Sequence, residues 1–173
     1  MKNILVTGGA GFIGSHTCLI FLEKGFEVFV VDSFINSNKK SLEKILNIFS
    51  KSDIYDPNKI HIFDGDIRNE KFLDEVFNFA KKKNKVIHGV IHFAGLKSVE
   101  ESLQNPLEYW DCNVKGTLKL LKIMKKYECK NIVFSSSATI YDNSTKNIKE
   151  DFRKKSINPY ASTKIVIEQL LSD

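Results

Sequence analysis

Residues 4–14 read Ile-Leu-Val-Thr-Gly-Gly-Ala-Gly-Phe-Ile-Gly, and this stretch decides the fold. Its apolar start predicts a buried strand, and Gly8, Gly11 and Gly14 follow in a G-x-x-G-x-x-G spacing. An early glycine permits a sharp turn, a middle one lets the backbone approach a pyrophosphate, and the last lets a helix pack closely on the strand. We expect an amphipathic helix over about Phe12–Lys24. This context favours a phosphate-binding loop over a plain glycine-rich turn.

The start of that helix and the end of the next strand predict how a dinucleotide is held. Phe12 and Ile13 begin the helix, where backbone N–H groups and the positive end of the helix dipole attract phosphate. A second buried strand is expected over residues 26–31, leading to Asp32, 18 residues after Gly14. A carboxylate there accepts hydrogen bonds from the adenosine ribose and repels a 2′-phosphate, which favours NAD over NADP. The alternative is that Asp32 only caps a turn.

The composition bounds the class of protein. The 173 residues, 42% hydrophobic and 27% charged, predict one soluble globular domain. The net charge of +5 comes from scattered lysines without interleaved aromatic motifs, which favours a solvated surface over nucleic-acid binding. Three widely spaced cysteines predict no metal site and no disulfide framework, and they fit a reducing, cytoplasmic compartment. The first strand leaves no room for a signal peptide, and no apolar run is long enough to span a membrane.

Strands alternate with helices along the rest of the chain. We expect three further strands, at residues 59–63, 86–93 and 131–135. We expect helices over residues 41–49, 69–80 with Asn69 as N-cap, 106–124 and 160–171. Residues 81–85 are expected to form a solvated turn, and residues 142–155 a mobile loop. Repeated βα units predict an α/β fold of the Rossmann type, a doubly wound parallel sheet with helices on both faces.

Ligands of such sheets bind beyond the carboxyl ends of the strands, so the residues at those ends are candidate site residues. After the third strand, Asp66 is placed to meet an adenine amino group, with Ile67 beside it. After the fourth strand comes a stretch small enough to let a dinucleotide pass, formed by Phe93, Ala94 and Gly95.

A serine after the fifth strand and a tyrosine–lysine pair predict catalysis. Tyr160 and Lys164 are spaced Y-x-x-x-K, which puts both side chains on one face of a helix. Tyrosine is normally too weak a base, but a nearby ammonium and the positive nicotinamide favour the phenolate and lower its pKa. Ser137 is placed to hydrogen-bond the same substrate hydroxyl. The Y-x-x-x-K spacing is common by chance, and its position after a cofactor loop and a serine favours the catalytic interpretation.

At these residues the chain resembles the extended short-chain dehydrogenase/reductase family, and within it the UDP-glucose 4-epimerases. The resemblance covers nearly the whole chain. Besides the glycine loop, it rests on Gly-Asp-Ile-Arg at 65–68, His-Phe-Ala-Gly-Leu-Lys at 92–97, Asn-Val-Lys-Gly-Thr at 113–117, Phe-Ser-Ser-Ser-Ala-Thr-Ile-Tyr at 134–141, and Pro-Tyr at 159–160 with Lys164. The blocks at 93–97 and 135–139 are specific to the epimerases.

The resemblance implies an isomerase that uses NAD to interconvert UDP-glucose and UDP-galactose, inverting C4 through a 4-keto intermediate. It implies tightly held NAD, with Lys97 and Asn113 near the cofactor and Asn36 and Ser37 near its adenosine end. Two alternatives stay open: a non-catalytic NAD-binding module, and another enzyme of the extended family that acts on a nucleotide sugar.

Two features separate this chain from its relatives. Nucleotide-sugar 4,6-dehydratases carry an Asp-Glu pair where this chain has Ala138 and Thr139, which argues against dehydration. The epimerases usually have glycine where this chain has Asp142, which is expected to change the turn at the edge of the active site.

The resemblance also implies a domain organisation and a homodimer. Residues 1–173 are expected to form the NAD-binding domain, while family members continue with another strand and a smaller domain that binds most of the UDP-sugar. Family members pair through the long helix and the Tyr/Lys helix. In this chain both helices carry extra apolar residues, among them Leu107, Trp110, Leu118, Ile165, Val166 and Ile167.

Overall fold

A computed structural model of the chain describes residues 2–141 and 147–173. The chain divides into two compact units. Unit 1 comprises the residues up to Ala94 together with Lys119–Ser135, and unit 2 comprises Gly95–Leu118 and Ser136–Asp173. The sequence predicted a single domain and did not reveal this division.

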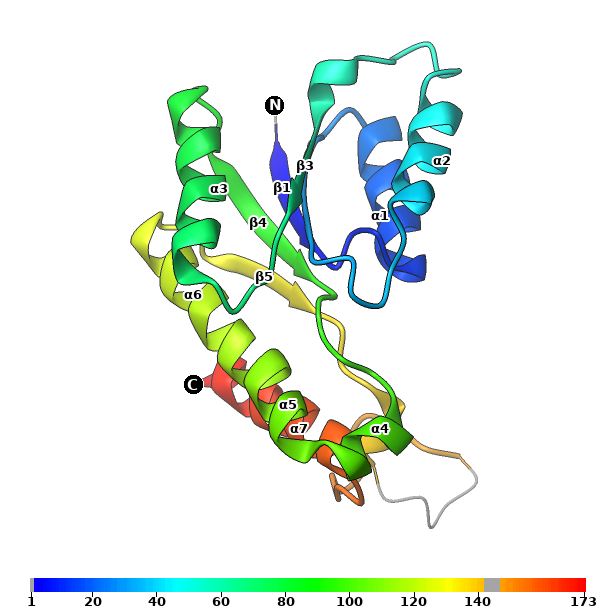
Figure 1. Cartoon of the computed structure of the whole chain (residues 1–173), viewed down its shortest axis with the longest axis vertical. Coiled ribbons are helices and arrows are strands. Elements are labelled where there is room, and N and C mark those ends of the chain that lie inside the picture. The colour runs from blue at the N-terminus through cyan, green and yellow to red at the C-terminus, as the bar shows by residue number, and fades with distance from the viewer. Residues whose placement is uncertain (1, 142–146) are drawn as a thin grey trace. The chain divides into compact units, whose positions relative to one another are not determined.

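Unit 1 is built on a five-stranded sheet in the order β3-β2-β1-β4-β5 (Figure 1). The strands are β1 (Asn3–Thr7), β2 (Glu27–Asp32), β3 (Ile60–Asp64), β4 (Ile87–His92) and β5 (Asn131–Phe134). Every pairing is parallel. All six residues of β2 are buried, as expected for an inner strand covered by helices on both faces. The predicted parallel sheet is confirmed, and the predicted strand bounds agree with the structure within two residues.

Helices cover both faces of this sheet, which confirms the doubly wound Rossmann-type fold (Figure 1). Four helices contribute to unit 1: α1 (Phe12–Glu23), α2 (Lys39–Phe49), α3 (Glu70–Lys82) and α6 (Gly116–Lys126), which begins in unit 2. One apolar cluster joins Val28 and Val30 of β2 to α1 and α2. The other joins Phe29 and Val31 of the same strand to α3 and α6. Alternate residues of one strand therefore feed two cores, as the pleat requires.

Polar side chains set where the helices begin. The side chain of Asn38 accepts a hydrogen bond from the Lys40 N–H, so α2 begins two residues before the predicted start. The predicted N-cap of α3 is confirmed, since Asn69 Oδ1 accepts from the Phe72 N–H. The predicted amphipathic character of α1 is wrong, because its outer side carries exposed Phe12 and Ile20.

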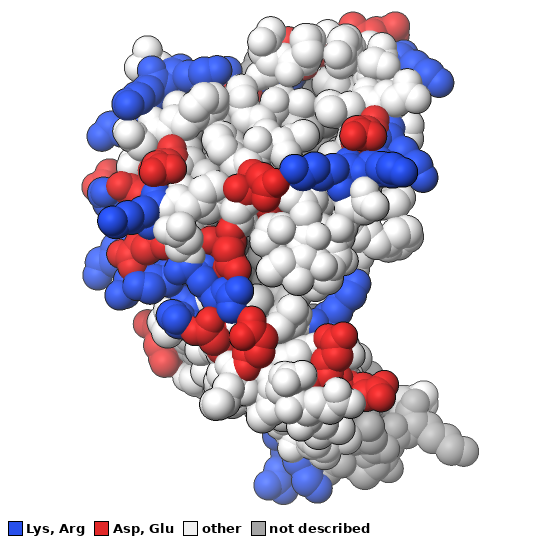
Figure 2. Space-filling view, in the orientation of Figure 1, with Lys and Arg blue, Asp and Glu red and all other residues white. Residues whose placement is uncertain are grey.

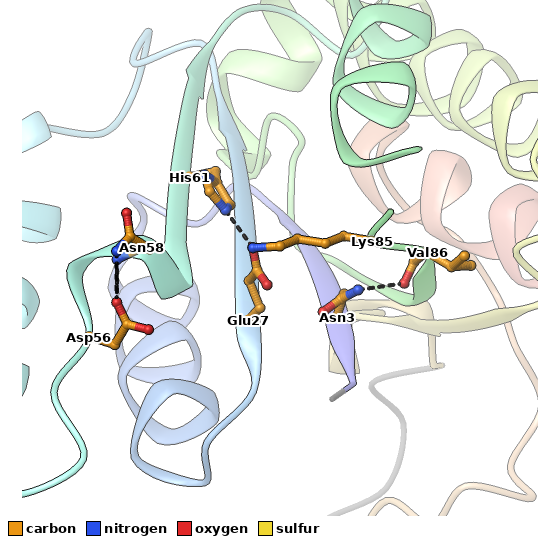
Figure 3. Close-up of polar contacts among 7 residues, drawn as sticks. All are labelled: Asn3, Glu27, Asp56, Asn58, His61, Lys85 and Val86. Atoms are coloured by element: carbon orange, nitrogen blue, oxygen red, sulfur yellow. Dashed lines mark hydrogen bonds and ion pairs between the residues drawn. The ribbon is translucent and has the colours of Figure 1, made fainter. Parts of the chain in front are cut away.

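The N-terminal ends of the strands are joined through one buried carboxylate (Figure 3). Glu27, at the start of β2, has only 3% of its side chain exposed. Its Oε1 lies 2.5 Å from His61 Nε2 of β3 and 2.6 Å from Lys85 Nζ, just before β4. The prediction of a solvated turn over residues 81–85 is therefore wrong for Lys85, whose ammonium neutralises Glu27. A buried carboxylate is tolerated only with such partners.

The surface of unit 1 pairs its charges. On α3 and α6, Lys126 lies 2.7 Å from Asp74, and Lys119 also pairs with Glu70. Figure 2 shows acidic and basic side chains interspersed over the visible face. Lysines that pair with carboxylates on the surface are consistent with the expectation that the net positive charge comes from solvated lysines. Among the described residues, no helix has the length and apolarity needed to cross a bilayer.

Unit 2 contains the helices that follow β4 and β5. They are α4 (Val99–Gln104), α5 (Pro106–Tyr109), the π-helical segment η2 (Trp110–Lys115), the start of α6, the short 3₁₀ helix η3 (Ala138–Ile140) and α7 (Pro159–Ser172). The predicted continuous helix over 106–124 is thus interrupted by a π segment, and α4 was not predicted. A further 3₁₀ turn, η1 (Pro57–Lys59), belongs to unit 1.

The predicted mobile loop over 142–155 falls partly outside the described residues, and so does Asp142. The described part, from residue 147 on, is tied to its surroundings in unit 2. Tyr141 forms an antiparallel bridge with Lys154, and Lys154 Nζ lies 2.6 Å from Glu168 Oε2 on α7. This hydrogen bond lowers the pKa of Glu168 against the opposing effect of burial.

Candidate functional site

The glycine loop of unit 1 has the geometry that its spacing predicts. Gly8 has a φ of +68°, a turn that a side chain disfavours, and a Cβ there would lie 2.6 Å from the Ala94 nitrogen. A Cβ on Gly14 would lie 2.9 Å from Gly9 Cα and closer still to the Gly8 carbonyl oxygen. Gly11 precedes α1 with an ordinary φ of −67°. The turning role of Gly8 and the close packing of Gly14 are therefore confirmed.

The residues that open α1 leave its N-terminal end uncovered within unit 1. Phe12 and Ile13 are 79% and 60% exposed, which is unusual for large apolar side chains. The N-terminal end of the helix carries backbone N–H groups without intrahelical acceptors, so it is a ready anion site.

Asp32 organises the loop that follows β2. The carboxylate is buried, and its Oδ2 accepts a hydrogen bond of 2.8 Å from the Ala10 N–H in the glycine loop. Its Oδ1 accepts from the Phe34 N–H at 2.9 Å and from Ser37 Oγ at 2.8 Å. Asp32 thus caps a turn, and it also joins the glycine loop to the loop that carries Asn36, an exposed residue. The sequence offered ribose binding and turn capping as alternatives for Asp32, and the structure shows the turn-capping contacts.

The ends of β3 and β4 carry the remaining unit 1 candidates. Arg68 holds the Asp66 carboxylate, since its backbone N–H, Nε and Nη2 donate at 2.8, 2.9 and 2.7 Å. The neighbouring Ile67 is buried in the core and is therefore a packing residue in this structure.

Two residues that the sequence did not single out brace the loop at the end of β4. Thr7 Oγ1 lies 2.7 Å from His92 Nδ1 in the interior, and it also accepts from the Ala94 N–H at 3.3 Å. The Phe93 N–H donates to the Thr7 carbonyl at 3.0 Å. These contacts hold Phe93 and Ala94 against the glycine loop. The sequence marks Thr7 and His92 only as polar residues, each at the end of an apolar strand.

In unit 2, Asn113 fixes the loop that begins with Gly95. Its Oδ1 accepts from the Leu96 N–H at 2.8 Å, and its Nδ2 donates to the Leu96 carbonyl at 3.0 Å and to Thr163 Oγ1 at 3.1 Å. A side chain on Gly95 would lie 2.9 Å from Asn113 Oδ1. Asn113 lies in the π segment, a feature that occurs often at functional sites. The next candidate, Lys97, is exposed.

Tyr160 and Lys164 lie on the first turns of α7, and both are buried. The Lys164 Nζ lies 5.8 Å from the centroid of the Tyr160 ring. Burial lowers the pKa of Lys164 to about 8, and the nearby Cys112 partly opposes this effect. The pair therefore places an ammonium group and a phenol close together on one helix, an arrangement that general acid–base chemistry can use.

Ser137 lies just before η3 in unit 2. Its Oγ accepts from the Thr139 N–H at 3.2 Å and lies 2.9 Å from Thr139 Oγ1. Unit 2 therefore contains Gly95, Lys97, Asn113, Ser137, Tyr160 and Lys164, and unit 1 contains the glycine loop, Asp32 and Asp66. In the part of the chain that the structure describes, no three His, Cys, Asp or Glu side chains gather as a potential metal site.

A parallel Rossmann-type sheet with a glycine loop, together with a Tyr-x-x-x-Lys helix, defines a protein of the extended short-chain dehydrogenase/reductase type. The chain belongs to the family described as GDP-mannose 4,6 dehydratase, which matches residues 5–173.

Several UDP-glucose 4-epimerases are similar to this chain. It is 42% identical to the UDP-glucose 4-epimerase of Schizosaccharomyces pombe over 99% of this chain and 46% of that protein. It is 43% identical to the enzyme of Bacillus subtilis over 98% of this chain and 47% of that protein. The crystal structure of the Bifidobacterium longum enzyme, in complex with NAD+ and UDP, matches 99% of this chain and 48% of its own, with a TM-score of 0.86 and 41% identity. The chain thus spans about half the length of the relatives it matches.

Proposed function

We propose that this chain is the NAD-binding part of a UDP-glucose 4-epimerase, which interconverts UDP-glucose and UDP-galactose. The observation that carries the proposal is the buried Tyr160–Lys164 pair on α7. The similarity to UDP-glucose 4-epimerases over nearly all of this chain supports the substrate class. Residues 1–173 act as the NAD-binding domain of the proposed enzyme.

The glycine loop fits a dinucleotide. Gly8 and Gly14 permit the tight turn of the loop, since a Cβ on either would collide with backbone atoms of the protein. The loop and the start of α1 would hold the pyrophosphate, and Asp32 with Ser37 would hold the adenosine ribose. The B. longum and Brucella ovis epimerases were crystallised with NAD, which supports the same cofactor here. When bound, NAD supplies the means of removing hydride from C4 of the sugar and returning it.

The side chains of unit 2 move the proton. The Tyr160 phenolate accepts the proton of the sugar 4-hydroxyl at Oη, and the Lys164 ammonium stabilises that phenolate before the transfer. Ser137 Oγ orients that hydroxyl. Burial brings the pKa of Lys164 to about 8, close to neutral pH. A small change in the charge or polarity around Lys164 therefore changes how much of it is protonated, which suits a residue that tunes Tyr160.

Epimerisation is favoured over dehydration within the family. Dehydration needs an acid and a base beside the serine, and Ala138 and Thr139 supply neither carboxylate. The second candidate is a non-catalytic NAD-binding module, in which the glycine loop serves cofactor binding alone. In that case the Tyr160–Lys164 pair would lack a positioned substrate, because binding energy from the remote parts of a substrate orients its reacting atoms.

The cofactor assignment is tested by calorimetric titration of the purified chain with NAD and with NADP. NAD is expected to bind at least about tenfold more tightly, because Asp32 disfavours a 2′-phosphate. Asp32→Asn is expected to narrow that difference, and Asp64→Asn on the same sheet edge is the control. Equal affinities in the unaltered chain would remove the role given to Asp32.

The epimerase assignment is tested by joining residues 1–173 to the remaining part of the S. pombe enzyme. We expect interconversion of the two UDP-hexoses, and a loss of about 10²–10⁴-fold in kcat for Tyr160→Phe with NAD still bound. Tyr127→Phe, in unit 1, is the matched control. Near-normal turnover by Tyr160→Phe would show that another group is the base, and no turnover by the joined protein with NAD bound would favour the non-catalytic module.

We propose further that the protein is a cytoplasmic homodimer. Unit 2 exposes large apolar side chains on its helices, which supports a protein partner at this surface. Leu107 of α5 is 82% exposed, and Val166 of α7 is 39% exposed.

A further inference from the structure

Tyr109 is buried against the tyrosine that the sequence marks as catalytic. It lies at the end of α5 in unit 2, is 1% exposed, and is among the largest fully buried side chains of the described residues. The ring centroids of Tyr109 and Tyr160 are 6.4 Å apart, and the ring planes cross at 82°. This is the edge-to-face arrangement that aromatic pairs prefer.

The hydroxyl of Tyr109 is anchored to α4. Tyr109 Oη donates a hydrogen bond of 3.2 Å to Glu101 Oε2. Glu101 itself is held in the first turn of α4, where its N–H donates to Ser98 Oγ at 3.3 Å. Burial, followed by the hydrogen bond and charge of Glu101, raises the pKa of Tyr109. Tyr109 therefore remains protonated and keeps donating, so its ring has one preferred orientation.

The backbone of Tyr160 is held separately. Thr163 Oγ1 donates to the Tyr160 carbonyl at 2.7 Å and accepts from Asn113 Nδ2 at 3.1 Å. These bonds fix the backbone of the first turn of α7 and do not involve the Tyr160 ring. Among the described residues, Tyr109 is the aromatic ring that packs on it.

We infer that Tyr109 is a positioning residue that sets the orientation of the Tyr160 ring, with Glu101 as its anchor. The inference deepens the proposed function and rests on it, because ring orientation matters to the reaction only if Tyr160 Oη takes the proton. Proton transfer requires the base within hydrogen-bond reach of the hydroxyl, so a rotated ring loses rate without losing substrate. The inference also gives a role to α4, a helix that the sequence did not predict, because α4 carries Glu101, the anchor of Tyr109.

The test observes the Tyr160 ring directly, by NMR of the 173-residue chain with ¹³C-labelled tyrosine rings. The Tyr160 signals are identified by their absence in Tyr160→Phe. We expect Tyr109→Leu to shift them, because the neighbouring ring current is lost, and Tyr109→Phe to restore most of their position. Tyr55→Leu is the matched control, since Tyr55 packs edge-to-face on Phe49 in unit 1 and should leave Tyr160 unchanged.

Unchanged Tyr160 signals in folded Tyr109→Leu would overturn the inference. If that variant does not fold, Tyr109→Phe and Glu101→Ala decide. Both remove the hydrogen bond between Tyr109 and Glu101 and are expected to broaden the Tyr160 signals with little change in position, and unchanged widths in both would overturn the inference. In the protein joined to the S. pombe half, Tyr109→Leu should lower kcat roughly tenfold with KM within about twofold. The ring signals are independent of turnover, so they test Tyr109 even if Tyr160→Phe shows that Tyr160 is not the base.

Discussion

At the scale of single residues, burial gives ordinary side chains unusual properties. Lys164 is the clearest case, because α7 places its ammonium in the interior beside the Tyr160 ring. Asp32 is buried too, but three protein donors satisfy its carboxylate. For Lys164, burial removes water from the ammonium, and this desolvation lowers its pKa to about 8.

The first prediction concerns Lys164 and pH. Its pKa is about 8 in the folded chain, against roughly 10.4 when unfolded. Between these values the unfolded chain binds more protons, so the free energy of unfolding rises with pH across this window. At pH 7 the cost of burying the charge is fully present, about 3 kcal/mol. Lys164→Met is therefore expected to raise the free energy of unfolding at pH 7 and to flatten its increase between pH 8 and 10.

Urea denaturation at pH 7 and pH 9.5 measures both effects. Lys125→Met on α6, an exposed position, is the control and should change neither. Parallel pH dependences for the unaltered chain and Lys164→Met would contradict the prediction.

At the scale of secondary structure elements, the sheet of unit 1 is secured at both ends of its strands. The carboxyl ends meet in the Thr7–His92 hydrogen bond and the glycine loop, and the amino ends meet at Glu27 (Figure 3). Glu27 links β2 to β3 through His61, and to the start of β4 through Lys85.

The second prediction concerns this carboxylate. Glu27→Ala leaves the His61 and Lys85 side chains without their buried partner and is expected to lower the free energy of unfolding by about 3 kcal/mol. Asp64→Asn breaks the Lys39–Asp64 pair, whose side chains are 63% and 58% exposed, and is expected to cost less than about 1 kcal/mol. Urea denaturation at pH 7 compares the two variants, and similar costs would show that Glu27 is not a structural link.

At the scale of the whole molecule, the candidate residues fall in two units. Unit 1 contains the glycine loop and the five-stranded sheet, and unit 2 contains Tyr160, Lys164 and helices with exposed apolar side chains. Within the described residues, β5 pairs only with β4, and its Val133 is 61% exposed. An uncovered edge strand and exposed apolar helices both favour association with another chain.

The third prediction is that the purified chain self-associates at micromolar concentration, as measured by sedimentation. Leu107→Ser together with Val166→Ser is expected to shift the population towards monomer, because both side chains are exposed on unit 2. The paired control is Ile54→Ser, a 42% exposed residue of unit 1. A single monomeric species of the unaltered chain across the concentration range would contradict the prediction of a homodimer.

Local patterns in the sequence determined much of this protein. Continuous apolar runs predicted the five strands, and helical spacing of apolar residues predicted most of the helices, since both patterns reflect burial. Gly8, Gly14 and Asn69 were assigned correctly because a turn, a close approach and a helix cap each demand particular residue types. The Y-x-x-x-K spacing placed Tyr160 and Lys164 together because a helix brings residues four apart onto one face.

Only the tertiary structure decided the features that join distant segments. Lys85 was expected in a solvated turn, but the fold places it beside Glu27 of β2. No pattern in the sequence singled out Tyr109, whose ring packs on that of Tyr160. The π segment at Asn113 and the short helix α4 carry weak local signals, and contacts with Leu96, Thr163 and Tyr109 accompany them. Local propensity amounts to tenths of a kcal/mol per residue, whereas one buried, well-partnered polar group is worth about 1 kcal/mol or more, so long-range contacts decide such segments.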